Sequence, residues 1–232
     1  MRTVLNAKIY VGGSSRERCL ESARDLVRNR IGDLDVEYEV RLRDDDRIEV
    51  EGIGDDIEAA LNHLTDTFGA METDPKEGKE YIGTLEGWND DGFVVDIGRD
   101  VLVPKESLTE LGQGTPSQIR ERFGLVQHIP LEIVWYSNRD EGSSDNRPRL
   151  SPEQVDRLWS WRKGSDRVNV NSATRAEVRA TVNRAGHAHD IVTVERLGLL
   201  EQSIICEEDT DAPGLLANIG NYIRGEMMCV VS

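Results

Sequence analysis

Lysine, cysteine, aromatic residues and long hydrophobic runs are all scarce in this 232-residue chain. Only five of its 28 basic residues are lysines, and its formal net charge is −16. An acidic surface that is poor in lysine helps a protein stay hydrated in concentrated salt. The composition therefore predicts a cytoplasmic protein of a salt-accumulating halophile, and favours an archaeon. An ordinary acidic cytosolic protein is the alternative.

The missing features also argue against several classes of function. No apolar stretch approaches membrane-spanning length, and the N-terminal apolar run is too short for a secretory signal. The cysteines Cys19, Cys206 and Cys229 form no close-spaced pair, so free thiols in a reducing compartment are expected. The sequence has no phosphate-binding glycine loop and no nucleophile elbow. We therefore expect a protein without enzymatic activity and without a cofactor.

The two ends of the chain show the same order of elements. Residues 1–72 follow the order β-α-β-β-α, with helices ending at Gly32 and Gly69. Residues 150–232 begin with a helix capped by Ser151 and then give β-α-β-β-α-β. Both orders are those of a ferredoxin-like layer, in which two helices cover one face of a sheet. The chain is therefore predicted to be α+β.

The segment between these layers has the pattern of a small barrel. Residues 81–108 read YIGTLEGWNDDGFVVDIGRDVLVPKESL, and residues 92–98 form the glycine-bounded run GFVVDIG. This segment resembles the S1 type of OB-fold domain, which usually holds RNA. Thr115 is predicted to cap a short helix after it. The expected architecture is an S1-like OB barrel over residues 79–137, flanked by the two ferredoxin-like layers.

The S1 resemblance also implies contact residues on the barrel. S1 domains usually carry aromatic residues on the outer face of their second and third strands, where bases stack. Here Asp91 and Val94 stand at positions where aromatic residues are common, and Phe93 remains. The resemblance implies Phe93 and Lys105 as RNA contacts. The alternative is a barrel kept as a scaffold, with Phe93 and Trp88 in its core.

A local excess of positive charge gives a second indication of RNA binding. Residues 147–184 contain nine basic residues and only four acids. Within this range, RLWSWRKGSDR interleaves two tryptophans with four cations, as expected for phosphate contacts combined with base stacking. The contacts predicted in this range are Trp161, Arg162, Lys163, Arg167, Arg175 and Arg179.

Helical spacing distinguishes some of these side chains. Leu158 and Trp159 share one face, so Trp159 is expected in the core, whereas Trp161 lies off that face and is expected to be exposed. Arg175 and Arg179 stand one turn apart on a predicted helix and are spaced to bridge two phosphates. Alternatively, they pair with the acidic surface of a neighbouring domain.

The segment around Asp211 supports a different class of function. TDAPGLLA resembles the turn with which ACT regulatory domains bind amino acids. The resemblance implies a ligand-sensing protein in which Asp211, Pro213 and Gly214 contact the ligand. The simpler interpretation is a helix cap followed by a first-turn proline.

A third interpretation is a metal-dependent enzyme. His187, His189 and Asp190 place two imidazoles and a carboxylate close together in the sequence. The alternative is a pair of histidines near a helix C-terminus, where the helix dipole favours positive charge. No second cluster follows at a matching spacing.

The whole chain is also similar to a family of uncharacterised archaeal proteins defined as a domain of unknown function. That resemblance implies one shared architecture and no particular activity. Together with the barrel and the basic cluster, it predicts a non-enzymatic protein that binds RNA or a ribonucleoprotein in translation or RNA metabolism. Because phosphate-driven affinity falls steeply with salt, a structured partner such as the ribosome is favoured over free single strands.

Overall fold

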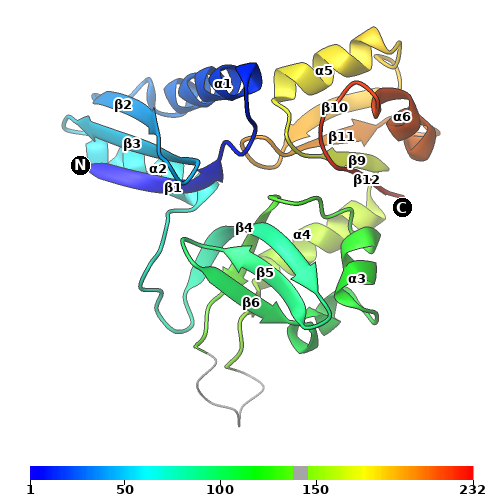
Figure 1. Ribbon diagram of the computed structural model, residues 1–232, viewed down its shortest axis with the longest axis horizontal. Coiled ribbons are helices and arrows are strands. Elements are labelled where there is room, and N and C mark those ends of the chain that lie inside the picture. The colour runs from blue at the N-terminus through cyan, green and yellow to red at the C-terminus, as the bar shows by residue number, and fades with distance from the viewer. Residues whose placement is uncertain (138–145, 232) are drawn as a thin grey trace.

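The computed structural model describes residues 1–137 and 146–231, and it confirms the predicted α+β class. The strands form three sheets, and every strand pairing within them is antiparallel. In Figure 1 the N-terminal unit (blue to cyan) and the C-terminal unit (yellow to red) lie on either side, with the green central sheet below them. Among the described residues, no helix is both long enough and apolar enough to cross a membrane.

The N-terminal unit is a three-stranded sheet with two helices. Its elements are β1 (Arg2–Lys8), α1 (Ser14–Ile31), β2 (Glu37–Leu42), β3 (Arg47–Ile53) and α2 (Ile57–Phe68), with strand order β1-β3-β2. On α1 the buried residues Cys19, Ala23, Val27 and Ile31 recur every fourth position, as one helical face requires. Ala70, just after α2, makes an isolated bridge to Leu5 of β1.

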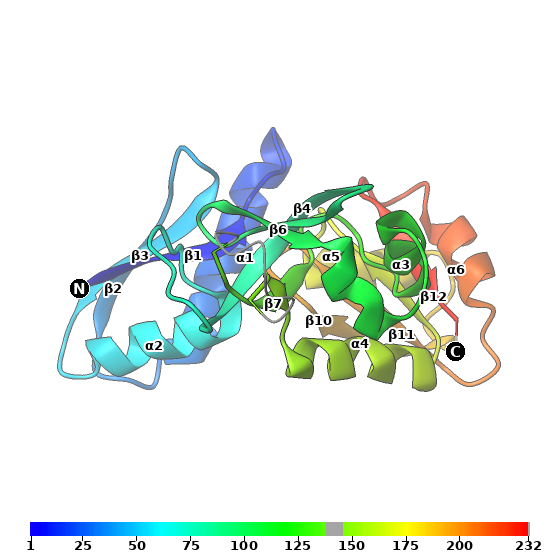
Figure 2. The same ribbon diagram turned by 90° about the horizontal axis from the view of Figure 1, so that it is seen from below.

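The central unit contains a five-stranded sheet that curls, as Figures 1 and 2 show. Its elements are β4 (Glu80–Asn89), β5 (Gly92–Asp96), β6 (Asp100–Pro104), the 3₁₀ helix η1 (Lys105–Leu111), α3 (Pro116–Arg122), β7 (Pro130–Val134), β8 (Arg149–Leu150) and α4 (Pro152–Lys163). The strand order is β6-β5-β4-β7-β8. At Gly92 a Cβ atom would lie 2.0 Å from the carbonyl oxygen of Val103, so only glycine fits where β5 approaches β6.

The predicted capping of α3 is confirmed. The Thr115 hydroxyl accepts the backbone N–H of Gln118 at 3.3 Å, and the Gln118 side chain accepts the backbone N–H of Thr115 at 2.9 Å. Pro116 occupies the first helical position, where its missing N–H costs nothing. The local sequence alone determines where this helix begins.

Helix α4 belongs to the central core, and not to the C-terminal unit in which the expected range 150–232 places it. Leu158 and Trp161 of α4 are buried in the same hydrophobic cluster as Phe93, Leu131 and Leu150 of the central sheet. The apolar face of an amphipathic helix does not specify the sheet against which it packs, so the sequence of α4 is compatible with either neighbouring sheet.

The C-terminal unit is a four-stranded sheet with two helices. Its elements are β9 (Arg167–Val170), α5 (Arg175–Arg184), β10 (Ile191–Arg196), β11 (Gln202–Cys206), α6 (Ala212–Ile219) and β12 (Met227–Val230), with strand order β10-β11-β9-β12. Helix α5 begins at a reciprocal capping box, in which Thr174 and Glu177 satisfy each other's backbone N–H groups.

Two of the hydrophobic clusters contain residues from a neighbouring unit. Leu199 and Leu200, from the turn between β10 and β11, are buried in the N-terminal cluster. Leu197 and Val230 of the C-terminal unit are buried in the central cluster. The units therefore pack against one another through their cores.

Candidate functional site

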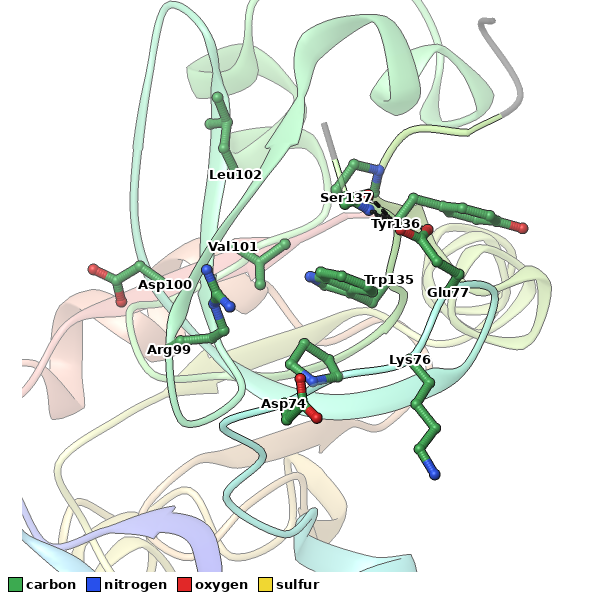
Figure 3. Close-up of a pocket in the computed structure, with 12 residues that line it drawn as sticks. Asp74, Lys76, Glu77, Arg99, Asp100, Val101, Leu102, Trp135, Tyr136 and Ser137 are labelled. Atoms are coloured by element: carbon green, nitrogen blue, oxygen red, sulfur yellow. Dashed lines mark hydrogen bonds between the residues drawn. The ribbon is translucent and has the colours of Figure 1, made fainter. Parts of the chain in front are cut away.

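A cavity of about 700 Å³ opens beside the curled central sheet. Its walls come from the segment before β4, the turn from β5 into β6, and the end of β7 with the residue before β8. Figure 3 shows this cavity. The residues that line it are Asp74, Pro75, Lys76, Glu77, Arg99, Asp100, Val101, Leu102, Trp135, Tyr136, Ser137 and Pro148.

Two consecutive aromatic side chains form one wall. The backbone N–H of Trp135 donates to the carbonyl of Lys79, and its carbonyl accepts the N–H of Gly78, both at 2.9 Å. These bonds hold the segment extended after β7, so neighbouring side chains point in opposite directions. Trp135 packs against the central cluster, and Tyr136 lies beneath the guanidinium of Arg149, 5.1 Å from its ring centre.

The opposite wall carries a positive charge. In Figure 3 the indole of Trp135 points toward Arg99 and Val101, whereas Tyr136 points away from them. The exposed guanidinium of Arg99 makes no hydrogen bond or ion pair with another described residue. An arginine facing an indole across an open space can enclose a flat ring between them.

The charges around the cavity are mixed. Lys76 and Arg99 are balanced by Asp74, Asp100 and Glu77. Glu77 is occupied, because both of its carboxylate oxygens accept the backbone N–H of Ser137 at 3.1 Å and one also accepts the Ser137 hydroxyl. The cavity is therefore suited to stacking and hydrogen bonding with a planar group rather than to collecting many phosphates.

The barrel contacts implied by the S1 resemblance are only partly available. Phe93 is 0 % exposed and lies at the centre of the central core, so its implied role as a stacking surface is wrong. Its position on β5 directs the ring inward, as the scaffold interpretation predicts. Lys105 is exposed at the start of η1 but does not line the cavity. Trp88 is half-buried under the guanidinium of Arg120, 3.7 Å from its ring centre.

Trp161 is also buried, contrary to the prediction from helical spacing. It is 4 % exposed, and the guanidinium groups of Arg157 and Arg167 lie 5.6 Å and 4.9 Å from its ring centre. Trp159 is partly buried and donates its indole N–H to the carbonyl of Glu110. Because α4 is covered on two sides, by the central sheet and by Arg167, a single apolar stripe does not describe it. Arg167, 8 % exposed, packs here and lies 3.5 Å from Glu195.

The remaining predicted contacts do not converge on the cavity. The side chain of Arg162 donates to the carbonyl of Val231, and Nε of Arg175 donates to the carbonyl of Val194 at 2.6 Å. Lys163 and Arg179 are exposed, at the end of α4 and on α5. The basic residues thus belong to several elements, and their proposed role in RNA binding stays a prediction.

A buried group of ionisable side chains joins the three units, and no local sequence pattern indicates it. The hydroxyl of Tyr10 donates to Glu201 at 2.5 Å and accepts the backbone N–H of Ser172 at 3.0 Å. The ring of His128 lies 3.9 Å from that of Tyr10, between ring centres. Burial raises the pKa of Glu201 to about 7, although the Tyr10 hydrogen bond acts in the opposite direction.

A second part of this junction contains ion pairs. Lys8 binds Glu86 at 2.8 Å and Asp96 at 2.5 Å, and Arg47 also binds Asp96. Burial opposes the ionisation of Glu86, but hydrogen bonds from His128 and Lys8 outweigh it and lower its pKa to about 2. These pairs tie β1 and β3 to the central sheet, so their role is structural.

The two alternative sites receive little support. Nδ1 of His187 lies 2.6 Å from Asp190, and its Nε2 lies 3.1 Å from the side chain of Asn218, so both ring nitrogens are engaged. His189 is exposed. Within residues 1–137 and 146–231, no group of three or more His, Cys, Asp or Glu residues is arranged to hold a metal ion.

Asp211 stands at the N-cap position of α6 and Pro213 lies in the first turn, as the simpler interpretation predicts, but the Asp211 side chain makes no capping hydrogen bond within the described part of the chain. A cavity of about 780 Å³ lies beside Asp211, and Pro213 and Gly214 are not among its lining residues. Its wall contains five acids, namely Asp166, Glu207, Glu208, Asp209 and Asp211. Such a wall repels the carboxylate of an amino acid.

The adjacent aromatic residues Trp135 and Tyr136 are not among the contacts predicted from the sequence, which is expected only to form a barrel over residues 79–137. Two consecutive aromatics at a strand end, next to a polar linker, are a signal that could have indicated them. Trp135 and Tyr136 are half-buried where β7 ends, so each ring keeps part of its surface accessible for binding.

The fold and the site define a three-unit α+β protein with a ligand-sized cavity on its central sheet. The chain belongs to the DUF2110 family: the models of the DUF2110 N-terminal, central and C-terminal domains match residues 2–74, 75–162 and 165–231. The central match includes α4, in agreement with the packing of that helix. No curated protein matches the chain.

Proposed function

We propose that this protein binds RNA or a ribonucleoprotein without catalysing a reaction, and that the cavity beside the central sheet receives a base. The observation that carries the proposal is the pairing of Trp135 with Arg99, which has no partner among the described residues, across an open space of about 700 Å³. Stacking on an aromatic side chain contributes about 1–3 kcal/mol per base and works for every base.

In this proposal the curled sheet is an S1-like OB barrel. Its order β6-β5-β4-β7-β8, with η1 and α3 between β6 and β7, supports that assignment. The flanking sheets are proposed to be ferredoxin-like layers. The order β10-β11-β9-β12 supports this for the C-terminal unit, and the bridge of Ala70 to Leu5 marks the place of a fourth strand in the N-terminal unit.

The proposed setting is the cytoplasm of a halophilic archaeon, supported by the net charge of −16 and the scarcity of lysine. Two cations line the cavity, and single-strand binding loses about 0.7 powers of salt concentration per phosphate contact. Two contacts therefore cost roughly 25-fold in affinity for a tenfold rise in salt. Because stacking depends little on salt, a site of this kind retains binding where a purely basic surface does not.

The test is fluorescence anisotropy with fluorescein-labelled 12-mers of poly(U) and poly(A) RNA, at 0.1 M and 1 M KCl. We expect Arg99→Gln to weaken binding at least fivefold. Arg24→Gln removes the same charge from an exposed position on α1, outside the cavity, and is expected to leave binding unchanged. Lys105→Gln removes the contact that the S1 resemblance implies, and Lys105 does not line the cavity. Its effect on RNA affinity therefore shows whether that position contributes separately from the cavity.

Recovery of the native protein from lysate at high salt is the companion experiment, with nuclease treatment as the control. Co-migration with ribosomal subunits or RNA supports the proposal. The proposal is contradicted if the RNA shows no change of anisotropy at 0.1 M KCl and the native protein is recovered from lysate free of RNA and ribosomal subunits.

A further inference from the structure

A second cavity, of about 460 Å³, lies between the N-terminal and C-terminal units. Figure 1 shows α1 and α5 meeting near their ends at this place. Side chains of α1, α5 and the segment after α6 line it, so neither unit forms it alone. Its volume falls within the range of about 300–1,000 Å³ that is typical of small-molecule sites.

The wall of this cavity is positively charged although the whole chain is acidic. Arg18, Arg184 and Arg224 line it, and Glu177 is the acid among its lining residues. Glu177 already accepts the N–H and hydroxyl of Thr174 and lies 3.5 Å from Arg18.

Two of these arginines have no partner among the described residues. The guanidinium groups of Arg184 and Arg224 are exposed and make no hydrogen bond or ion pair with another part of the described chain. Arg18 donates to the hydroxyl of Ser15 at 3.0 Å. Guanidinium groups bind phosphate oxygens in a bidentate manner, so the cavity has the donors that an anionic group needs.

A largely buried threonine lines the same cavity. Thr181 of α5 is 7 % exposed and lines the cavity, yet its hydroxyl has no hydrogen-bond partner among the described residues. A threonine within a helix commonly satisfies its hydroxyl on the preceding turn. The Thr181 hydroxyl is therefore available to donate to an oxygen of a molecule bound in the cavity.

The N-terminus of α1 adds to these donors. Gly13 occupies the cap position with φ 62°, and no side chain of the described residues caps the helix. The first N–H groups of a helix have no partner within it and lie at the positive end of its dipole. Ser14 and Ser15 stand at these positions and line the cavity. Backbone N–H groups at such an end bind phosphate.

An aromatic residue completes the arrangement. Tyr222 lines the cavity and is 64 % exposed, which makes it one of the most exposed large hydrophobic side chains described. An exposed phenol ring beside an anion site can stack on a base. We propose that this cavity binds a nucleotide, with its phosphate among Arg184, Arg224, Thr181 and the N-terminus of α1, and its base on Tyr222.

The nucleotide can be a free nucleoside monophosphate or the 5′-phosphorylated end of an RNA chain, since both present the same phosphate. This site is separate from the cavity on the central sheet and does not rest on the function proposed for that cavity. Failure of RNA binding at Trp135 leaves it unaffected.

Isothermal titration calorimetry of the full chain tests the proposal. The probes are AMP, GMP, CMP and UMP, with the four unphosphorylated nucleosides as controls. We expect at least one monophosphate to bind and its nucleoside to bind at least tenfold more weakly. Arg184→Gln and Arg224→Gln are each expected to weaken binding at least fivefold, and Thr181→Val at least threefold.

Arg179→Gln is the matched control, because it removes the same charge from an exposed position of the same helix outside the cavity. We expect its dissociation constant to stay within twofold of the wild type. If Arg179→Gln and Arg184→Gln weaken monophosphate binding equally, the site is contradicted, because binding then depends on the overall charge of the helix and not on the cavity. The absence of heat with all four monophosphates at millimolar concentration also contradicts it.

A further comparison identifies the source of the phosphate. A 5′-phosphorylated RNA hexanucleotide is compared with the monophosphate and with the same hexanucleotide lacking its 5′-phosphate. If the phosphorylated hexanucleotide binds at least tenfold more tightly than the monophosphate, and this gain is lost without the phosphate, the site is a receptor for an RNA end. Equal affinities support the site as a receptor for the free nucleotide. The hexanucleotide measurements are made in the Arg99→Gln background, so that RNA bound at the central-sheet cavity does not contribute to them.

Discussion

Replacing Glu201 with glutamine tests the electrostatics of the junction between the three units. Glu201 is 4 % exposed and receives a hydrogen bond from the Tyr10 hydroxyl at 2.5 Å. Its second carboxylate oxygen accepts the backbone N–H of Leu200 at 3.2 Å. Glutamine keeps the shape of this side chain and an acceptor for Tyr10, but it cannot ionise, and its NH2 group cannot accept the Leu200 N–H.

The expected magnitude follows from the raised pKa. Burial raises the pKa of Glu201 to about 7 in the folded protein, from the ordinary value of 4.5 for a glutamate in water. The folded state therefore binds the proton more tightly than the unfolded state, and stability falls as the pH rises from 4.5 through 7. A difference of 2.5 pKa units corresponds to about 3 kcal/mol at pH 8.

The assay is urea denaturation of both proteins between pH 4 and pH 8. We expect the stability of the glutamine variant relative to the wild type to rise by about 3 kcal/mol between pH 4 and pH 8, whatever constant difference the lost Leu200 hydrogen bond adds at both pH values. Glu208→Gln makes the same change at an exposed position and is expected to leave the pH profile unchanged. Parallel pH profiles for the wild type and Glu201→Gln refute the reasoning. His128 faces the same junction, so the comparison is made between variants rather than within one titration.

Three further predictions concern the junction between the units and the central core. Tyr10→Phe removes the hydroxyl that serves the buried carboxylate and is expected to cost about 1–3 kcal/mol in the free energy of unfolding by urea denaturation, whereas an unchanged midpoint contradicts the hydrogen bond. Trp161→Ala should cost about 3–5 kcal/mol and Lys163→Gln less than about 0.5 kcal/mol, and equal effects would mean that the tryptophan is exposed. The pKa of Glu86 is about 2 in the folded protein, so its contribution to the free energy of unfolding is lost as the pH falls from 4.5 towards 2. We expect this loss to be about 2 kcal/mol in the wild type, after allowance for the partial exposure of Glu86. Thermal unfolding curves of Glu86→Gln should not show it.

Local structure followed from the sequence wherever local chemistry decides it. The capping box of Thr115 and Gln118 and the four-residue spacing of buried residues on α1 are encoded within a few positions. Strand alternation likewise predicted the order of elements at both ends of the chain. These signals need no knowledge of what lies across the molecule.

Packing between distant segments could not be predicted in the same way. Trp161 was expected to be exposed because one helical face was assigned to the core, but α4 is covered on a second side by Arg167 of the next strand. The pair Tyr10 and Glu201 joins residues 191 positions apart, and nothing near either residue indicates the other. The cavity at Trp135 likewise depends on Arg99 arriving from another strand turn.

Photo-crosslinking tests the central claim, RNA binding at the Trp135 cavity, most directly. The purified protein is mixed with a 12-mer RNA that contains 4-thiouridine, irradiated, and digested for mass spectrometry of the attached peptides. We predict crosslinks at Trp135 or Tyr136, and a marked loss of these crosslinks in Arg99→Gln. Crosslinks confined to the basic range 147–184, or none at all, contradict the claim.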